Sequence, residues 1–156
     1  MNTDKVFITK EKYSELEAEL EQLSVEGRTE MAQQLDSAKA MGDLKENAEY
    51  HQAREDQAVM EERINHITSV LKHATIIKGG KHQVVEVGAH VVVARKGSSA
   101  RQEFQIVGPE ESDPAAGKLA FDSPLVVAMI GKQEGEFFEF TTPSNETVEW
   151  KVVEVK

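Results

Sequence analysis

Two carboxylates, Asp43 and Glu46, stand three positions apart where the chain must reverse between two helical stretches. Mg²⁺ prefers oxygen ligands and is often held by only one or two protein carboxylates together with waters and phosphate. Two acids on an exposed tip cannot form a tight site alone, but they could complete a site whose other ligands come from a partner and a phosphodiester. A metal held there would activate a water or stabilise the leaving oxygen of a hydrolysis. One interpretation of the two acids is therefore a metal-assisting pair.

The same two residues also fit a simpler interpretation. In a capping box, Asp43 would accept a hydrogen bond from the backbone N–H of Glu46, and Glu46 would reach back to the N–H of Asp43. Acids are also favoured at a helix N-terminus, where the helix dipole is positive. On spacing alone, the pair could merely begin a helix, so both interpretations stay open here.

Two basic residues flank the tip, Lys39 before it and Arg54 after it. They could bind the backbone of a single-stranded nucleic acid, because positively charged grooves follow such backbones. The alternative is ordinary pairing on the helix surface, for Arg54 with Glu55 or in the neighbourhood of Tyr50, which contributes little stability.

Composition restricts the classes of function. The chain has 156 residues, with 28 acidic and 18 basic side chains and a formal net charge of −10. Such a balance argues against a protein that coats nucleic acid by itself, because phosphate neutralisation needs clustered Lys and Arg. The absence of cysteine excludes disulfides and thiolate metal sites. No signal peptide and no apolar run of about 20 residues is present, so we expect a soluble, cytoplasmic protein.

The histidines, glycines and serines of the chain do not indicate a further functional site. The five histidines are His51, His66, His73, His82 and His90. No pair of them has metal-ligand spacing with a third donor in view, so we expect no metal site there. Gly79 and Gly80 stand alone and indicate a turn rather than a phosphate-binding loop. No serine lies in a recognisable nucleophile elbow.

The first half of the chain predicts two long helices. Apolar positions of the second helix repeat in steps of three and four: Tyr50, Ala53, Gln57, Met60, Ile64, Ile67, Leu71 and Ala74. This heptad pattern requires a partner helix packed along it. The first helix should begin after Thr9 as its N-cap, and its spacing slips around Val25 to Thr29, which predicts an irregularity there. Since a short connection joins the two helices, residues 1–75 should form an antiparallel coiled-coil hairpin.

The second half, residues 76–156, predicts strands and turns. Val84 to Val93 indicates one strand, or two around a bulge at Gly88, and Glu103 to Val107 indicates another. Ser123, Pro124 and Gly131 bound a predicted short helix over 125–130. Alternating segments at 136–142 and 147–155 predict a hairpin around residues 143–146. A small sheet with one helix across it gives an α+β fold class.

Two segments resemble a known family. The segment GDLKENAEYHQARE at 42–55 closely resembles the tip motif of bacterial transcript cleavage factors of the GreA/GreB family, and SPLVVAMIGKQEGE at 123–136 resembles a second motif of that family. The order of a helical hairpin followed by a small β-rich domain is similar too. The resemblance implies an FKBP-like fold for residues 76–156 and a functional tip at residues 42–50 of the hairpin.

The resemblance implies a specific activity. A factor of this family binds bacterial RNA polymerase through its β-rich domain and inserts the coiled coil into the secondary channel. The tip acids, here Asp43 and Glu46, then help to hold a second Mg²⁺ in the active centre of the polymerase, which hydrolyses the 3′ end of backtracked RNA. Lys39 and Arg54 match positions that contact the extruded RNA. The other residues of the tip motif are Gly42, Asn47 and Tyr50. The expected protein is a monomer without turnover of its own and without a membrane partner.

The chain departs from the family pattern at two places. Residues 26–30 replace a segment that often contains Arg-Pro-Glu, and Lys39 stands where Arg is common. Lysine keeps the charge but lacks the planar fork of arginine, so its contact with RNA should be weaker. The acidic balance and the sparse basic patch are more similar to the GreA branch than to GreB, which implies release of short 3′ fragments.

Two other functions remain open. A factor that occludes the polymerase channel as an inhibitor would use the same arm, although the retained Asp-x-x-Glu pattern counts against it. A prolyl isomerase or chaperone would use the β-rich domain alone, but similarity of fold is weak support for an activity.

Overall fold

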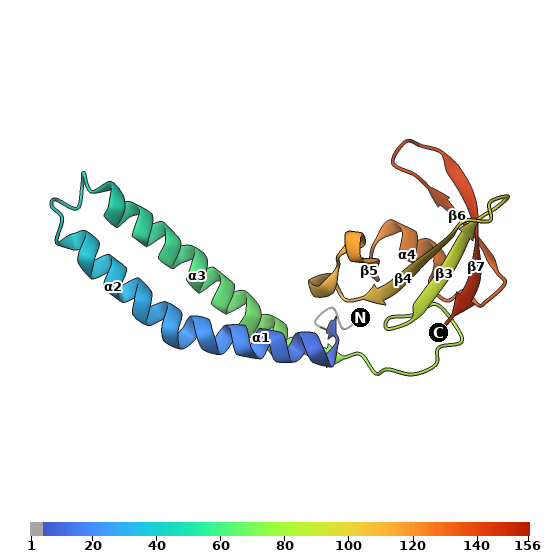
Figure 1. Cartoon of the computed structure of the whole chain (residues 1–156), viewed down its shortest axis with the longest axis horizontal. Helices are drawn as coiled ribbons and strands as arrows, with labels where there is room; N and C mark the ends of the chain where they lie inside the picture. The colour runs from blue at the N-terminus through green and yellow to red at the C-terminus, as the bar shows by residue number, and fades with distance from the viewer. Residues whose placement is uncertain (1–4) are drawn as a thin grey trace. The chain divides into compact units, whose positions relative to one another are not determined.

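The computed structural model describes residues 5–156, and the contacts among them divide the chain into two units (Figure 1). The hairpin unit is Tyr13–Ala74, and the body unit combines residues 5–12 with Thr75–Lys156. The hairpin unit is helical and the body unit is built around a β-sheet, so the predicted α+β fold class is confirmed. None of the helices within the described residues is long and apolar enough to cross a membrane.

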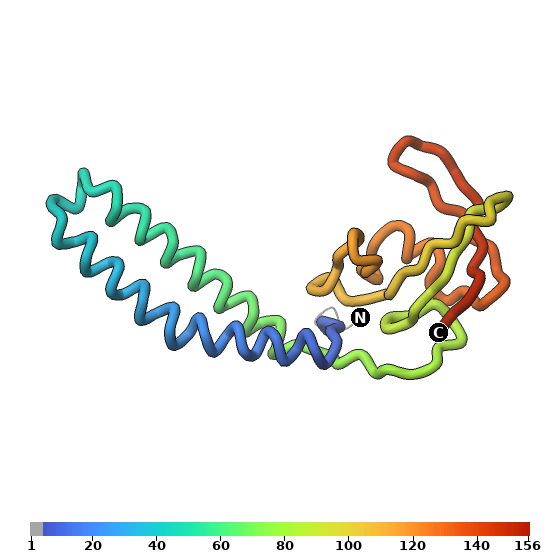
Figure 2. Tube along the Cα trace, viewed as in Figure 1, coloured from blue at the N-terminus to red at the C-terminus, as the bar shows by residue number. Residues whose placement is uncertain are grey.

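The helices of the hairpin unit follow the predicted pattern. They are α1 (Lys10–Gln22), whose first three residues belong to the body unit, the π-helical turn η1 (Leu23–Gly27), α2 (Arg28–Lys39) and α3 (Ala48–His73). Thr9 caps α1 as predicted, because its Oγ1 accepts a hydrogen bond from the N–H of Lys12 at 3.2 Å. Helix α2 packs antiparallel along α3, as Figures 1 and 2 show.

Apolar side chains fill the seam between the helices. The buried residues of the hairpin unit are Leu16, Leu35, Ala38, Ala53, Ile64, Ile67 and Val70. The predicted seam positions Ala53, Ile64 and Ile67 are among them, and the other members of that seam are half-buried. The heptad pattern therefore identified the buried face of α3 correctly.

The predicted irregularity of the first helix is the π-helical turn η1. It covers Leu23–Gly27, slightly before the expected position. A Cβ built on Gly27 would lie 3.1 Å from Sδ of Met60, so the glycine permits a close approach of the two helices. Turns of this kind arise as local interruptions of an α-helix, and here the interruption accommodates the slip in the apolar spacing.

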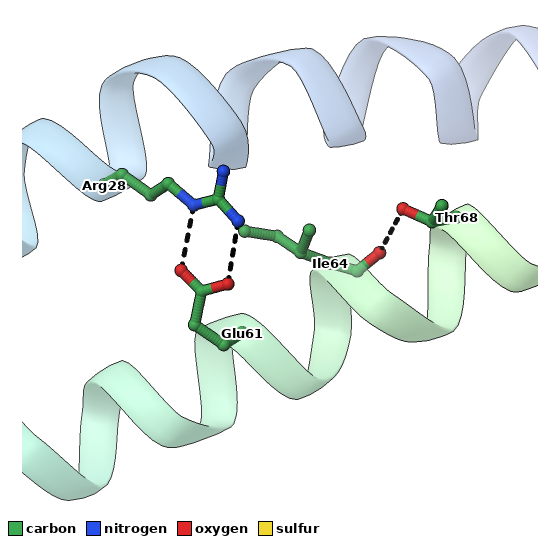
Figure 3. Close-up of polar contacts among 4 residues, drawn as sticks. All are labelled: Arg28, Glu61, Ile64 and Thr68. Carbon is green, nitrogen blue, oxygen red and sulfur yellow. Dashed lines mark hydrogen bonds and ion pairs between the residues drawn. The ribbon is translucent and has the colours of Figure 1, made fainter.

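Two pairs of charged side chains cross the seam near η1. Arg28 donates to Glu61 from Nε at 2.9 Å and from its terminal nitrogen at 2.8 Å (Figure 3). Arg63 makes an equivalent pair with Glu19 at 2.7 and 2.8 Å. The hydrogen bonds from Arg28 lower the pKa of Glu61 from its ordinary value, and the same contact raises the pKa of Arg28. These forked pairs fix the register of the hairpin more than they stabilise it, because both lie at the surface.

The body unit contains a five-stranded sheet in the order β5-β4-β3-β7-β6. Its strands are β3 (His90–Arg95), β4 (Arg101–Val107), β5 (Lys118–Ala120), β6 (Phe137–Thr141) and β7 (Thr147–Val155). Neighbouring strands are antiparallel except β4 and β5, which are parallel. Helix α4 (Pro124–Met129) packs against β6. The buried core is Val85, Ala89, Val91, Val93, Ile106, Val126, Met129, Phe138 and Val152.

Several elements of the body match the sequence and one does not. The strand at 103–107, the short helix after Ser123 and the hairpin at 136–155 are confirmed. The sequence predicted one strand from Val84 to Val93, or two around a bulge at Gly88, and both alternatives are wrong for the residues before Gly88: only His90–Val93 of this run lies in a strand, β3. Gly88 has a φ of +98°, which directs the chain away from a strand path, and Val84 forms only an isolated bridge with Gln133. The apolar residues before Gly88 therefore reach the core from a loop.

Two short strands at the base of the helices were not predicted. Strand β1 (Val6–Ile8) pairs with β2 (Ala74–Ile76) in a separate two-stranded sheet. Strand β1 also contacts turn η2, and residues 5–12 belong to the body unit, whereas the sequence placed residues 1–75 in the hairpin. Two further turns, η2 (Pro109–Glu111) and η3 (Pro114–Ala116), connect β4 to β5.

Candidate functional site

The predicted tip is the loop between the end of α2 at Lys39 and the start of α3 at Ala48. Gly42 lies in this loop with a φ of +146°, and a Cβ built on it would meet nothing within 4 Å. The position therefore requires glycine for its backbone conformation rather than for space. This conformation helps the chain to turn within a few residues.

Asp43 organises the loop locally. Its Oδ1 accepts a hydrogen bond from the N–H of Lys45 at 3.1 Å, and its backbone carbonyl accepts one from the N–H of Glu46 at 3.2 Å. The Glu46 side chain is exposed, and its carboxylate makes no hydrogen bond within the part of the chain that the structure describes. The capping box predicted as the alternative role for this pair is therefore not formed.

Asn47, not Asp43, caps α3. Its Oδ1 accepts the N–H of Tyr50 at 3.0 Å, which satisfies one of the free donors of the first helical turn. Its Nδ2 donates to the backbone carbonyl of Ala38, in the last turn of α2, at 2.6 Å. One side chain thus joins the end of one helix to the start of the next and closes the loop that carries Asp43 and Glu46.

The acidic side chains of the tip share one hollow. A cavity of about 390 Å³ is lined by Met41, Gly42, Asp43, Glu46, Asn47, Ala48 and Glu49. Glu49 is an addition to the pair predicted from the sequence. It lies in the same motif, but only the position of the helix start shows that it faces this hollow. Within residues 5–156, no three potential ligands are close enough together to hold a metal ion.

Two apolar side chains at the tip were also not predicted. Met41 is 69% exposed and Leu44 is 41% exposed, although large apolar side chains are usually covered. Leu44 stands between Asp43 and Glu46 in the chain. The only signal in the sequence is the presence of these residues in a segment that must be a turn.

The predicted basic residues lie on different helices. Lys39 is exposed in the last turn of α2. Arg54 is exposed on α3 and donates to Oε1 of Gln57 at 2.7 Å. The alternative prediction, pairing with Glu55 or near Tyr50, is therefore not the contact that forms. A neutral partner leaves the charge of Arg54 uncompensated. The ring of Tyr50 is half-buried and contacts His51 edge-on, with 6.0 Å between the ring centroids.

Comparisons with known proteins cover nearly the whole chain. A family described as "Transcription elongation factor, N-terminal" matches residues 6–76, and one described as "Transcription elongation factor, GreA/GreB, C-term" matches residues 80–156. Transcription elongation factor GreA of a Roseiflexus species is 35% identical and covers 100% of both chains. The protein of the same name from Bacillus cereus is 36% identical, also over 100% of both chains.

Solved structures were matched as well. GreA factor homolog 1 from Thermus thermophilus is 26% identical, with a TM-score of 0.45, and the alignment covers 97% of this chain and 99% of that one.

Proposed function

Because the chain belongs to the GreA/GreB family of transcription elongation factors, we propose that it binds bacterial RNA polymerase and stimulates cleavage of backtracked RNA by that enzyme. The body unit docks on the polymerase, and the hairpin enters the secondary channel. The reaction belongs to the active centre of the polymerase, so this protein has no turnover of its own. The nascent RNA 3′ end in the arrested complex is the second partner.

The observation that carries this proposal is the availability of the tip acids. Glu46 has an unbonded carboxylate, and Asp43 uses one oxygen for a single backbone contact. Both line the same hollow. Two exposed oxygen donors fit a Mg²⁺ ion that also has ligands from a partner and a phosphate, because this ion is commonly held by one or two carboxylates. When bound, such an ion would supply activation of water and stabilisation of the leaving oxygen.

The residues around the acids have separate roles. Asn47 holds the loop closed, so the two carboxylates are presented together instead of on a mobile turn. Lys39 and Arg54 are exposed beside the tip and would contact the phosphates of the extruded RNA.

The test compares matched charge-neutral variants in arrested elongation complexes formed with purified polymerase. Asp43→Asn and Glu46→Gln should each lower the saturated rate of RNA cleavage by at least about tenfold, because a lost ligand weakens a shared metal site. The concentration for half-maximal effect should stay unchanged. Glu55→Gln, which removes an exposed charge from α3 outside the hollow, is the control and should retain full activity.

The outcomes separate the proposed function from its alternatives. Full cleavage by the Asp43→Asn/Glu46→Gln double variant would contradict the role of the acids. If the native protein instead slows nucleotide addition and gives no cleavage, it is an inhibitor of the same enzyme. Isomerisation of a proline peptide by the full chain would indicate the third function.

A further inference from the structure

A carboxylate from the body unit holds the first turn of helix α1. Glu111, at the end of the turn η2, accepts two hydrogen bonds from Thr9. The backbone N–H of Thr9 donates to Oε2 at 2.8 Å, and its Oγ1 donates to Oε1 at 2.7 Å. The two residues are 102 positions apart in the chain and both are half-buried. Each carboxylate oxygen therefore has one donor from the same residue.

Thr9 connects Glu111 to the first turn of helix α1. Its Oγ1 donates its proton to Glu111 and accepts the N–H of Lys12 in the first turn of α1. A hydroxyl that donates to a carboxylate becomes a better acceptor, because hydrogen bonds in a chain polarise one another. The negative charge of Glu111 also lies at the N-terminus of α1, where the helix dipole favours it. The start of α1 thus depends on a side chain from the opposite half of the sequence.

The segment before Thr9 is packed tightly against the same part of the body. Ile8 is fully buried, and its carbonyl accepts the N–H of Ile77 at 2.8 Å. The rings of Phe7 and Phe121 meet edge-on, with 5.6 Å between centroids. A Cβ built on Gly108 would lie 1.6 Å from the carbonyl oxygen of Phe7, so the backbone of β1 crosses directly over the residue before η2. Strand β1 is therefore in direct contact with turn η2 and the residue before it, next to the Glu111–Thr9 pair.

The position of Thr9 makes this contact relevant to the hairpin. The chain passes between the two units twice, inside α1 after Lys12 and again after Ala74. The first passage is a continuous helix, and its first turn is the part that Glu111 holds. When the first turn of a helix loses the acceptors of its N–H groups, that turn can fray and its residues leave the helix.

The geometry points to Glu111 as a positioning residue for the activity proposed above: by holding Thr9, it keeps α1 helical to its first turn, and so prevents fraying at the start of the helix that leads into the hairpin. The inference rests on the proposed function. Glu111 does not touch RNA or metal in this scheme. Its loss should reduce the fraction of molecules in which the hairpin can enter the channel, and the apparent affinity falls by that same fraction. The chemical step, which depends on the tip, should be unaffected.

The structural part of the inference can be tested on the free full-length protein. Amide hydrogen exchange measured by NMR should accelerate at least about tenfold at Thr9 and Lys12 in Glu111→Ala. The N–H of Thr9 loses its acceptor, Glu111, and the N–H of Lys12 keeps an acceptor, Thr9 Oγ1, that Glu111 no longer holds in place. Exchange at Ile67 and Val93, in the two cores, should not change. Thr9→Val keeps the shape of the side chain and should accelerate exchange at Lys12 only. Unchanged exchange at Thr9 in Glu111→Ala would overturn the inference.

The functional part uses the cleavage assay with polymerase. Glu111→Ala should raise the concentration for half-maximal cleavage by about three- to tenfold and leave the saturated rate unchanged. Glu111→Gln retains one acceptor oxygen and should lie between the native protein and Glu111→Ala. Glu134→Ala removes an exposed carboxylate from the turn before β6 and is the control for charge.

The tip variants distinguish two kinds of failure. An unchanged half-maximal concentration in Glu111→Ala, or a loss of saturated rate alone, overturns the positioning role while the effect of Asp43→Asn on cleavage still supports the proposed function. If the tip variants stimulate cleavage normally, the proposed role of the acids is wrong, and if the native protein stimulates no cleavage, the proposed function itself is wrong. The exchange experiment then still decides whether Glu111 holds α1.

Discussion

The side chain of Asn47 makes two hydrogen bonds at the tip, and the effect of replacing it can be calculated from these two contacts. Its Oδ1 caps α3 by accepting the N–H of Tyr50, and its Nδ2 donates to the carbonyl of Ala38. Asn47→Ala removes both. Loss of an N-cap costs about 1 kcal/mol, and loss of a hydrogen bond between uncharged groups costs about 0.5–1.5 kcal/mol. The closed loop should therefore lose about 1.5–2.5 kcal/mol relative to an open one.

The matched variant Asn47→Asp separates the two contacts. Aspartate is as good an N-cap as asparagine, so the bond to the N–H of Tyr50 remains. A carboxylate cannot donate to the carbonyl of Ala38, and it repels that oxygen. Asn47→Asp should therefore open the end of α2 while it keeps the first turn of α3 closed. The two variants together assign a cost to each contact.

Two measurements check this prediction. Amide exchange of Tyr50 should accelerate about tenfold or more in Asn47→Ala, as a loss of at least about 1.4 kcal/mol requires, and should stay near native in Asn47→Asp. In the cleavage assay, both variants should lower the saturated rate, because the loop that carries Asp43 and Glu46 is no longer held to α2. Native exchange at Tyr50 in Asn47→Ala would refute the capping role, and native cleavage by both variants would refute the link between loop closure and activity.

Two further predictions concern stability. Gly108→Ala should lower the free energy of unfolding by about 3 kcal/mol or more in urea titrations, because its Cβ would overlap the carbonyl of Phe7, whereas Gly79→Ala, whose Cβ meets nothing within 4 Å, should be close to neutral. The pKa of Glu61 is lowered in the folded protein by its hydrogen bonds from Arg28, so the pair contributes stability above the ordinary pKa of a glutamate and loses it as the pH falls through the lowered value. In Glu61→Gln, this contribution to the pH dependence of the free energy of unfolding should be absent. The free energy of unfolding of both proteins is measured as the pH is lowered, and an identical pH dependence would contradict the prediction.

The sequence predicted the elements whose pattern is long and regular. The heptad spacing of α3 and the alternation of β6 and β7 each extend over enough residues to define a buried face. Strands β1 and β5 contain three residues each, which is too short for any period to be visible. The run from Val84 to Val93 has the composition of a strand, but β3 begins only at His90, after Gly88, and composition cannot show the positive φ of that glycine.

The spacing of residues in the sequence could not predict contacts between residues that are far apart in the chain. The sequence places the acids and Asn47 at the tip, but it cannot show that Nδ2 of Asn47 reaches a carbonyl nine residues earlier. The pair of Glu111 and Thr9, at a separation of 102 residues, leaves no local pattern at all. The resemblance to a family names residues that matter at the tip, yet a motif does not distinguish a residue that acts from one that holds the loop.

The two interpretations of the tip acids are mutually exclusive for Glu46, and the position of the cap separates them. In a capping box, the carboxylate of Glu46 would accept a backbone N–H, and any cation would have to compete with that bond. Because Asn47 caps the helix instead, α3 begins two residues after Glu46, and the carboxylate needs no bond to support the helix. The assignment of capping to a neutral amide thus leaves the acid available for a ligand that comes from outside the chain. For the same reason, a variant that moves the cap back to residue 43 should impair cleavage even if both acids are retained.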